Sequence, residues 1–147
     1  MAYITNSDIE RRLGSAAYVQ LTDDAGTGSA DETVVDAARV AAEGEVDSYL
    51  ARRHRVPIDV DSNAELAGLL SAATLDVVAF ALHGRRPPIP EDVALRYRAV
   101  LSWLARVAEG AVVLPAAAPL AGNPATGISA TAVGDEAVNS RSELEGL

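Results

Sequence analysis

The sequence contains no cysteine, which excludes disulfide bonds, thiolate catalysis and cysteine-bound zinc. It has two histidines, too few for a conventional histidine metal centre, and His54 stands among arginines, where we expect a solvated residue at a helix end. Aromatic residues make up 4% of the chain, so aliphatic side chains and alanine must fill the core. These shortages predict closely packed helices with no catalytic, metal or cofactor site.

Lysine is also absent, because all 12 basic residues are arginine. Arginine favours planar, two-point pairing with carboxylates, and this usage points to contacts with other proteins. With 21 acidic residues the formal net charge is −9, which argues against a protein whose affinity comes from neutralising phosphates. We therefore expect no binding of free nucleic acid.

No hydrophobic run reaches the ~18 uninterrupted apolar residues that indicate a membrane-spanning helix. The first residues lack the basic-then-apolar order of a signal peptide. A chain of 147 residues, 49% of them hydrophobic, fits one domain with a modest core. We expect a soluble protein that is made in the cytoplasm and has no membrane partner.

The clearest helical pattern lies between Asp31 and Pro57. Asp31 is placed to cap a helix over residues 31–53, and Pro57 closes the segment. Apolar residues of this helix recur at spacings of three and four, at Val35, Ala38, Ala42, Val46, Tyr49 and Leu50. The pattern predicts a long helix with one buried side.

Three further helices are predicted. Ser7 is the expected cap of a short helix over residues 8–13, and Ser62 that of a long helix ending near residue 83. A third helix covers residues 91–109 and ends at Gly110. The expected apolar faces of the two long helices are Leu66, Leu69, Leu70, Ala73, Val77, Val78 and Phe80, and Val93, Tyr97, Val100, Leu101, Leu104 and Val107.

Residues 15–21 form either a second short helix or an irregular packed segment, and the sequence does not separate the two. The fold class is therefore all-α, a small bundle of about four helices over residues 1–110. Trp103, the only tryptophan, lies off the centre of its apolar face, where it either covers the edge of the core or anchors a partner.

Five arginines are candidate interface residues. Arg52, Arg53 and Arg55 follow the first long helix, where they either oppose the negative end of its dipole or bind carboxylates of a partner. Arg85 and Arg86 open a proline-rich connector, and the same two interpretations apply to them.

The Gly- and Asp-rich loop 22–31 invites comparison with calcium loops. Ala25 occupies a position where a carboxylate is needed, so we expect a plain connection held by turn-forming residues. Asp76 lies near the apolar face of its helix. Because no second acid, histidine or nucleophile is placed to cooperate with it, we expect an ion pair with an arginine.

From residue 111 onward the composition changes to alanine, proline, glycine and serine. We expect residues 111–147 to form an extended, low-complexity arm that is held by neighbouring copies or by a partner. Fully extended, these 37 residues reach roughly 120 Å at ~3.3 Å per residue. The apolar cluster Val112, Val113 and Leu114 is suited to adding a strand to a partner's sheet edge, and Leu120 is a further candidate contact.

Three stretches of the chain match one known group of proteins. They are YITNSDIERRLG near the start, the segment 21–57, and RYRAVLSWLARVAEG before residue 111. They resemble the small phage proteins of the Mu-like head-completion family, which is similar in fold and role to the head–tail connector adaptors of long-tailed phages. The resemblance covers about residues 2–110 and contains packing and interface signatures but no catalytic motif.

The resemblance implies a structural protein and not an enzyme. Such a protein is a head-to-tail connector in the neck of the virion, made in the host bacterial cytoplasm, and forms a ring below the portal that extends the DNA channel toward the tail. The ring implied by the family is dodecameric. Its partners are other copies of the chain, the portal protein and a downstream neck or tail protein, while DNA passes without specific binding.

Two alternatives remain open at this point. The chain is another neck component, such as a stopper or a tail-completion protein, or it is a generic helical interaction module or ion-binding regulator. Stoppers and tail terminators are usually rich in β-structure, so helical content separates the first alternative from an adaptor.

Overall fold

The computed structural model describes residues 2–115 and 117. Within these residues there are five helices and no β-strand, which confirms the all-α prediction. The segment 15–21, left open by the sequence, is helical. The helices are α1 (Asn6–Leu13), α2 (Ser15–Thr22), α3 (Glu32–Leu50), α4 (Ala64–Gly84) and α5 (Glu91–Glu109).

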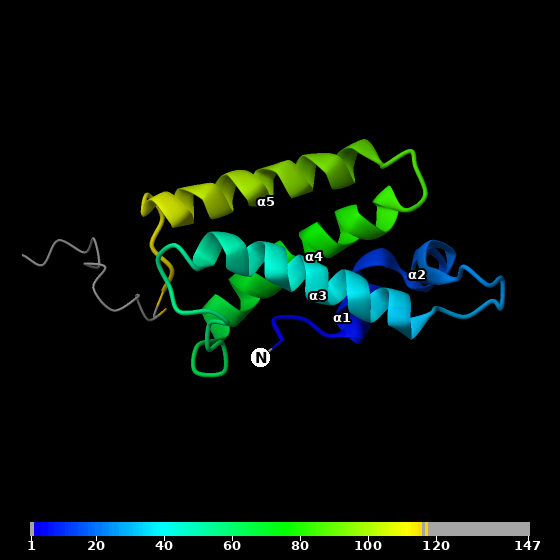
Figure 1. Cartoon of the computed structure of the whole chain (residues 1–147), viewed down its shortest axis with the longest axis horizontal. Coiled ribbons are helices and arrows are strands. Elements are labelled where there is room, and N and C mark those ends of the chain that lie inside the picture. The colour runs from blue at the N-terminus through cyan, green and yellow to red at the C-terminus, as the bar shows by residue number, and fades with distance from the viewer. Residues whose placement is uncertain (1, 116, 118–147) are drawn as a thin grey trace, which may run out of the picture.

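The three long helices each pack against the other two, and the short helices α1 and α2 pack against α3 and α4. Figure 1 shows α5 along one edge of the molecule, with α1 and α2 at the end where α4 turns into α5. Helices α3 and α4 are thus the central elements, because each of them contacts all four others. The phenol of Tyr97 in α5 stacks on Phe80 of α4 at 3.9 Å and donates to Glu45 of α3 at 2.7 Å, which joins the three long helices.

Helix α4 is long and apolar enough to cross a membrane by length and composition alone. Its central position accounts for this composition, since five of its apolar residues are at most 1% exposed: Leu66, Leu70, Val77, Val78 and Leu82. The prediction for Leu69 was wrong. Leu69 is 41% exposed, because it lies beside the line of buried residues on α4.

Two helix caps differ from those predicted. Thr5, not Ser7, caps α1: its hydroxyl accepts from the amide of Asp8 at 3.3 Å, and the Asp8 carboxylate accepts from the amide of Thr5 at 2.8 Å. Asn63, not Ser62, caps α4 and accepts from the amide three residues on at 3.0 Å. At both places several capping residues stand close together, and the sequence pattern alone does not choose among them.

The chain after α3 folds back against the bundle. Helix α3 is capped by Asp31 as predicted, but it ends at Leu50, and a turn follows. His54, expected in solvent, is 9% exposed and donates its backbone amide to Leu50 at 2.9 Å. The prediction for His54 was wrong because the turn points this residue toward the core. Ile58 is 4% exposed and continues the same buried segment.

Helix α5 ends at Gly110 in the left-handed conformation, with φ 81° and ψ 11°. The guanidinium of Arg53 occupies the space that a side chain at this position would need. The turn after α3 and the end of α5 are therefore in contact, and the cation lies near the negative end of the α5 dipole.

Gly110→Ala should destabilise the protein by at least about 1–2 kcal/mol, because an L-residue is strained in this conformation and Arg53 must move. Gly44→Ala is the matched control. Gly44 lies inside α3 with open space around it, and alanine there should stabilise the helix by about 0.5–1 kcal/mol. Denaturant unfolding measures both changes, and equal effects of the two substitutions would contradict the left-handed conformation of Gly110.

Candidate functional site

The arginines after α3 separate into two kinds. Arg52 and Arg55 are exposed and stay candidates for contacts with a partner. Arg53 is half-buried against Gly110. The helix end that Arg53 lies against is that of α5 and not that of α3, and its contact with a partner stays a prediction.

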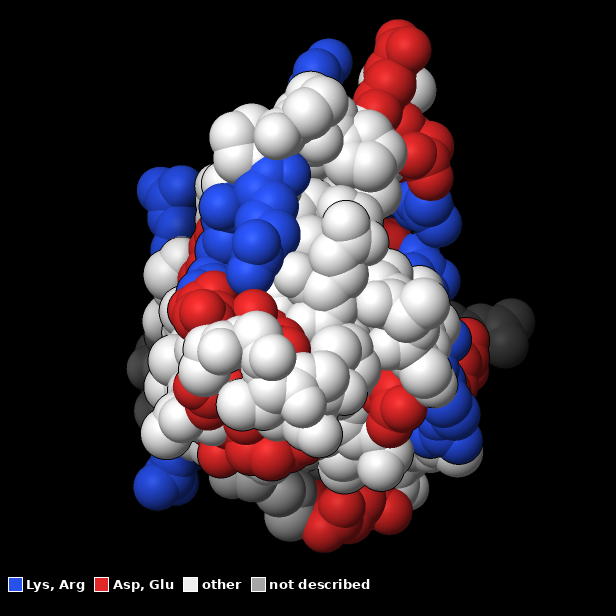
Figure 2. All heavy atoms as spheres, turned by 90° about the vertical axis from the view of Figure 1, so that its right-hand side faces the viewer, with Lys and Arg blue, Asp and Glu red and all other residues white. Residues whose placement is uncertain are grey.

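Arg85 and Arg86 bind acceptors at the end of α2 and in the α2–α3 loop. Arg85 donates to the carbonyl of Leu21 and pairs with the carboxylate of Asp24. Arg86 donates to the carbonyl of Asp23 at 3.1 Å and lies 3.4 Å from the Asp24 carboxylate. Their contacts thus fix the end of α4 to this loop. Figure 2 faces this end of the molecule and shows basic and acidic side chains side by side.

The loop compared with calcium sites is closed by its own hydrogen bonds. The carboxylate of Asp23 accepts from the amides of Thr27 at 2.9 Å and Gly28 at 2.7 Å. These bonds lower the pKa of Asp23, since they favour its charged form. Its oxygens are used to fold the loop, as expected for a turn, and among the described residues no group of three metal-ligating side chains is found.

Stability should fall at acid pH in a way that depends on Asp23. Because its folded pKa is lowered, its contribution is present above the unfolded pKa of ~3.9 and is lost as pH falls through the folded value. The melting temperature of Asp23→Asn should therefore fall less than that of the wild type between about pH 5 and pH 3. Asp61→Asn, on an exposed turn, is the control; if both variants show the wild-type pH profile, the loop contacts of Asp23 do not stabilise the fold.

The apolar residues after α5 do not lie on one exposed surface. Leu114 is 3% exposed and belongs to the core, while Val112 is half-buried and its amide donates to Arg106 at 3.3 Å. Val113 is 72% exposed. In this structure only Val113 of the predicted strand-adding cluster faces solvent, because the chain folds back under α5. Leu120 lies outside the described residues.

Tyr3 and Asp47, which lie in stretches that carry the resemblance, form part of a network. The Tyr3 hydroxyl donates to Asp47 at 2.5 Å and accepts from the amide of Ile58 at 2.9 Å, and the Tyr3 amide donates to Glu43 at 2.8 Å. Burial and the Asp47 carboxylate raise the pKa of Tyr3. These residues join the N-terminal segment, α3 and the chain after it, so their role here is structural.

A groove runs along the outer side of α4 and α5. Its apolar part measures about 330 Å³ and is lined by Leu69, Trp103 and small residues. Trp103 packs against the core and also lines this groove, so the geometry accommodates both interpretations of its role. Asp76 and Arg96 lie where the apolar part adjoins a second hollow of about 270 Å³.

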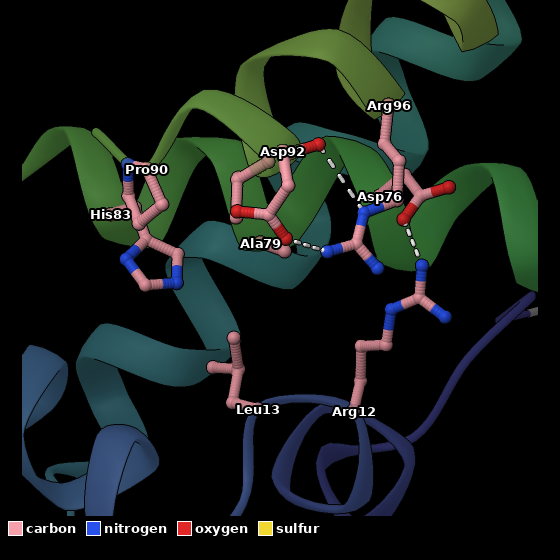
Figure 3. A pocket seen from close by; sticks show the side chains of 9 residues that line it. Arg12, Leu13, Asp76, Ala79, His83, Pro90, Asp92 and Arg96 are labelled. Carbon is pink, nitrogen blue, oxygen red and sulfur yellow. Dashed lines mark hydrogen bonds and ion pairs between the residues drawn. The ribbon is translucent and has the colours of Figure 1, made fainter.

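The second hollow has both apolar and charged side chains in its lining, which Figure 3 shows from close by. Asp76 pairs with Arg12 of α1, which confirms the expected carboxylate–arginine pair. Arg96 pairs with Asp92 within α5. Helical spacing predicted Leu69 to lie in the core, so the sequence analysis missed the groove. The sequence signal that could have indicated it is the set of small residues in its lining, Ala72, Ala73 and Ala99.

Comparison with known proteins gives one family. A family model described as Bacteriophage Mu, Gp36 matches residues 3–132, which is most of the chain. The match extends beyond residue 110, where the resemblance in the sequence was expected to end. Among curated proteins no match was found. The match supports a structural or assembly protein of a phage, a virion component made in the host cell. The chain belongs to the Bacteriophage Mu Gp36 family.

Proposed function

We propose that the protein is a non-enzymatic head-to-tail adaptor that forms a ring below the portal and extends the DNA channel toward the tail. The observation that carries the proposal is the combination of family membership with an all-α fold. Among neck proteins, stoppers and tail terminators are usually β-rich, so a helical bundle favours an adaptor. The ring is dodecameric, and the portal protein and a downstream neck or tail protein are its partners.

The charge of the chain supports a place in the wall of the DNA channel. A net charge of −9 with no lysine gives a surface that repels phosphates, which suits a channel through which DNA slides without binding. The start of α3 contributes exposed Asp31, Glu32 and Asp36. In Figure 2 acidic side chains gather toward the lower part of this end of the molecule.

The test uses particles of the phage that encodes the chain. Without the protein we expect DNA-filled heads that carry no tails, and addition of the purified protein should restore tail joining. Electron microscopy of complete particles should show helical density for it between the portal and the tail. Tailed, infectious particles without the protein, or density for it elsewhere in the virion, would refute the proposal.

A further inference from the structure

The α4–α5 groove is apolar along one part, and its charged lining residues are Arg96, which pairs with Asp92, and Asp76, which pairs with Arg12. Arg96, Ala99, Trp103 and Arg106 recur at spacings of three and four, which places them on one side of α5. Two arginines thus border the wall that contains Trp103. Opposite them on α4, Leu69 exposes 41% of its surface, which leaves apolar area uncovered.

The sequence after Ala117 has two parts of different chemistry. Residues 118–134 contain no charged side chain. Residues 135–147 contain four acids and one arginine, so their side chains carry a net charge of −3 (+1 − 4), and they include Leu144 between two glutamates. This acidic segment begins after the last residue that the family model matches, residue 132.

The uncharged part is long enough to carry the acidic segment to another molecule. Its 17 residues reach up to ~56 Å at ~3.3 Å per residue, whereas a domain of this size is roughly 35 Å across. Leu114 fixes the start of this path, because it is buried in the core.

We propose that the groove binds the acidic C-terminal segment 135–147 of a neighbouring copy. Leu144 packs against Trp103 and Leu69, and the flanking glutamates lie next to Arg96 and Arg106. Burial of the exposed Leu69 favours an occupant with an apolar side chain, and the exposed Arg106 favours an acidic one. The choice of a neighbouring copy rests on the proposed ring, in which each chain would hold the next.

Cysteine pairs in the full-length protein test the contact, because the natural chain has no cysteine. One chain carries Ala72→Cys in the groove and Ser142→Cys in the segment, which leaves Leu144 in place. The control chain carries Ala41→Cys, on the exposed side of α3, with Ser142→Cys. Under mild oxidation at about 10 µM protein, we expect the first chain to form a ladder of covalent oligomers on the order of a hundredfold faster, because docking raises the local concentration to the millimolar range.

A second pair of substitutions separates the groove from general surface effects. Leu69→Glu in the first chain should abolish the faster reaction, whereas Val40→Glu, at a residue 60% exposed on α3, should leave it unchanged. Equal rates in the Ala72 and Ala41 chains would show that the segment does not bind in the groove. A purely intramolecular disulfide would show that the segment comes from the same chain and not from a neighbouring copy. If the ladder is missing while particles still require the protein at the neck, this inference fails and the adaptor role stands.

Discussion

A chain that ends at Gly110 should be less stable than one that ends at Ala117 by about 2–5 kcal/mol, the cost of removing a buried leucine. Leu114 is 3% exposed and packs into the same core as the three long helices. The arm was predicted to begin at residue 111, and this division stays a prediction. Cutting there, however, would remove a core residue together with the arm. Urea unfolding of the two shortened chains measures the difference.

The full-length protein allows a sharper version of this experiment. Leu114→Ala should cost about 2–5 kcal/mol, whereas Val113→Ala, at a position 72% exposed, should change stability by less than about 0.5 kcal/mol. Similar small effects of both substitutions would show that Leu114 is not part of the core in solution. Tests of the arm should therefore shorten the chain after residue 117 and not after residue 110.

Tyr3→Phe should destabilise the protein by about 1–3 kcal/mol, although it removes only one oxygen atom. The Tyr3 hydroxyl donates a hydrogen bond to the carboxylate of Asp47 and accepts one from the amide of Ile58, and the second bond is buried. Without the hydroxyl, the buried amide of Ile58 loses the acceptor that Tyr3 provides. Thermal or denaturant unfolding at neutral pH measures the loss.

Tyr49→Phe is the control, because Tyr49 lies on the same helix as Asp47 and is half-buried. It should change stability by less than about 0.5 kcal/mol. Alkaline pH gives a second test. The raised folded pKa of Tyr3 means that its contribution is complete below the unfolded pKa of ~10 and is lost as pH rises toward the folded value. Tyr3→Phe should weaken this alkaline loss, and an unchanged profile would contradict the network.

Helical periodicity was sufficient for most of the fold. The buried positions of α3 (Val35, Ala42, Val46 and Leu50) follow from their spacing, and the end of α5 follows from Gly110. Periodicity could not place Leu69, because a helix surrounded by four others has apolar residues on nearly every side. The open face of α4 depends on which neighbours cover it, and local sequence does not specify that.

The interactions of the arginines depended on tertiary structure in the same way. The acceptors of Arg85 lie more than 60 positions away in the sequence, and Arg53 lies against a glycine of another helix. The sequence did identify the chemistry, since Asp76 pairs with an arginine as expected. It could not identify the partners, because such pairs form only when distant segments meet.

The position of Leu114 has a mechanical consequence. Residue 110 ends α5 beside Arg53, and Leu114 is buried only four residues later. Tension applied to the chain beyond residue 117 would therefore reach the hydrophobic core at Leu114 before it reached the last turn of α5. Unravelling of the helix from its end would first require extraction of this leucine from the core. A force applied to the chain beyond residue 117 would therefore be shared by the whole bundle.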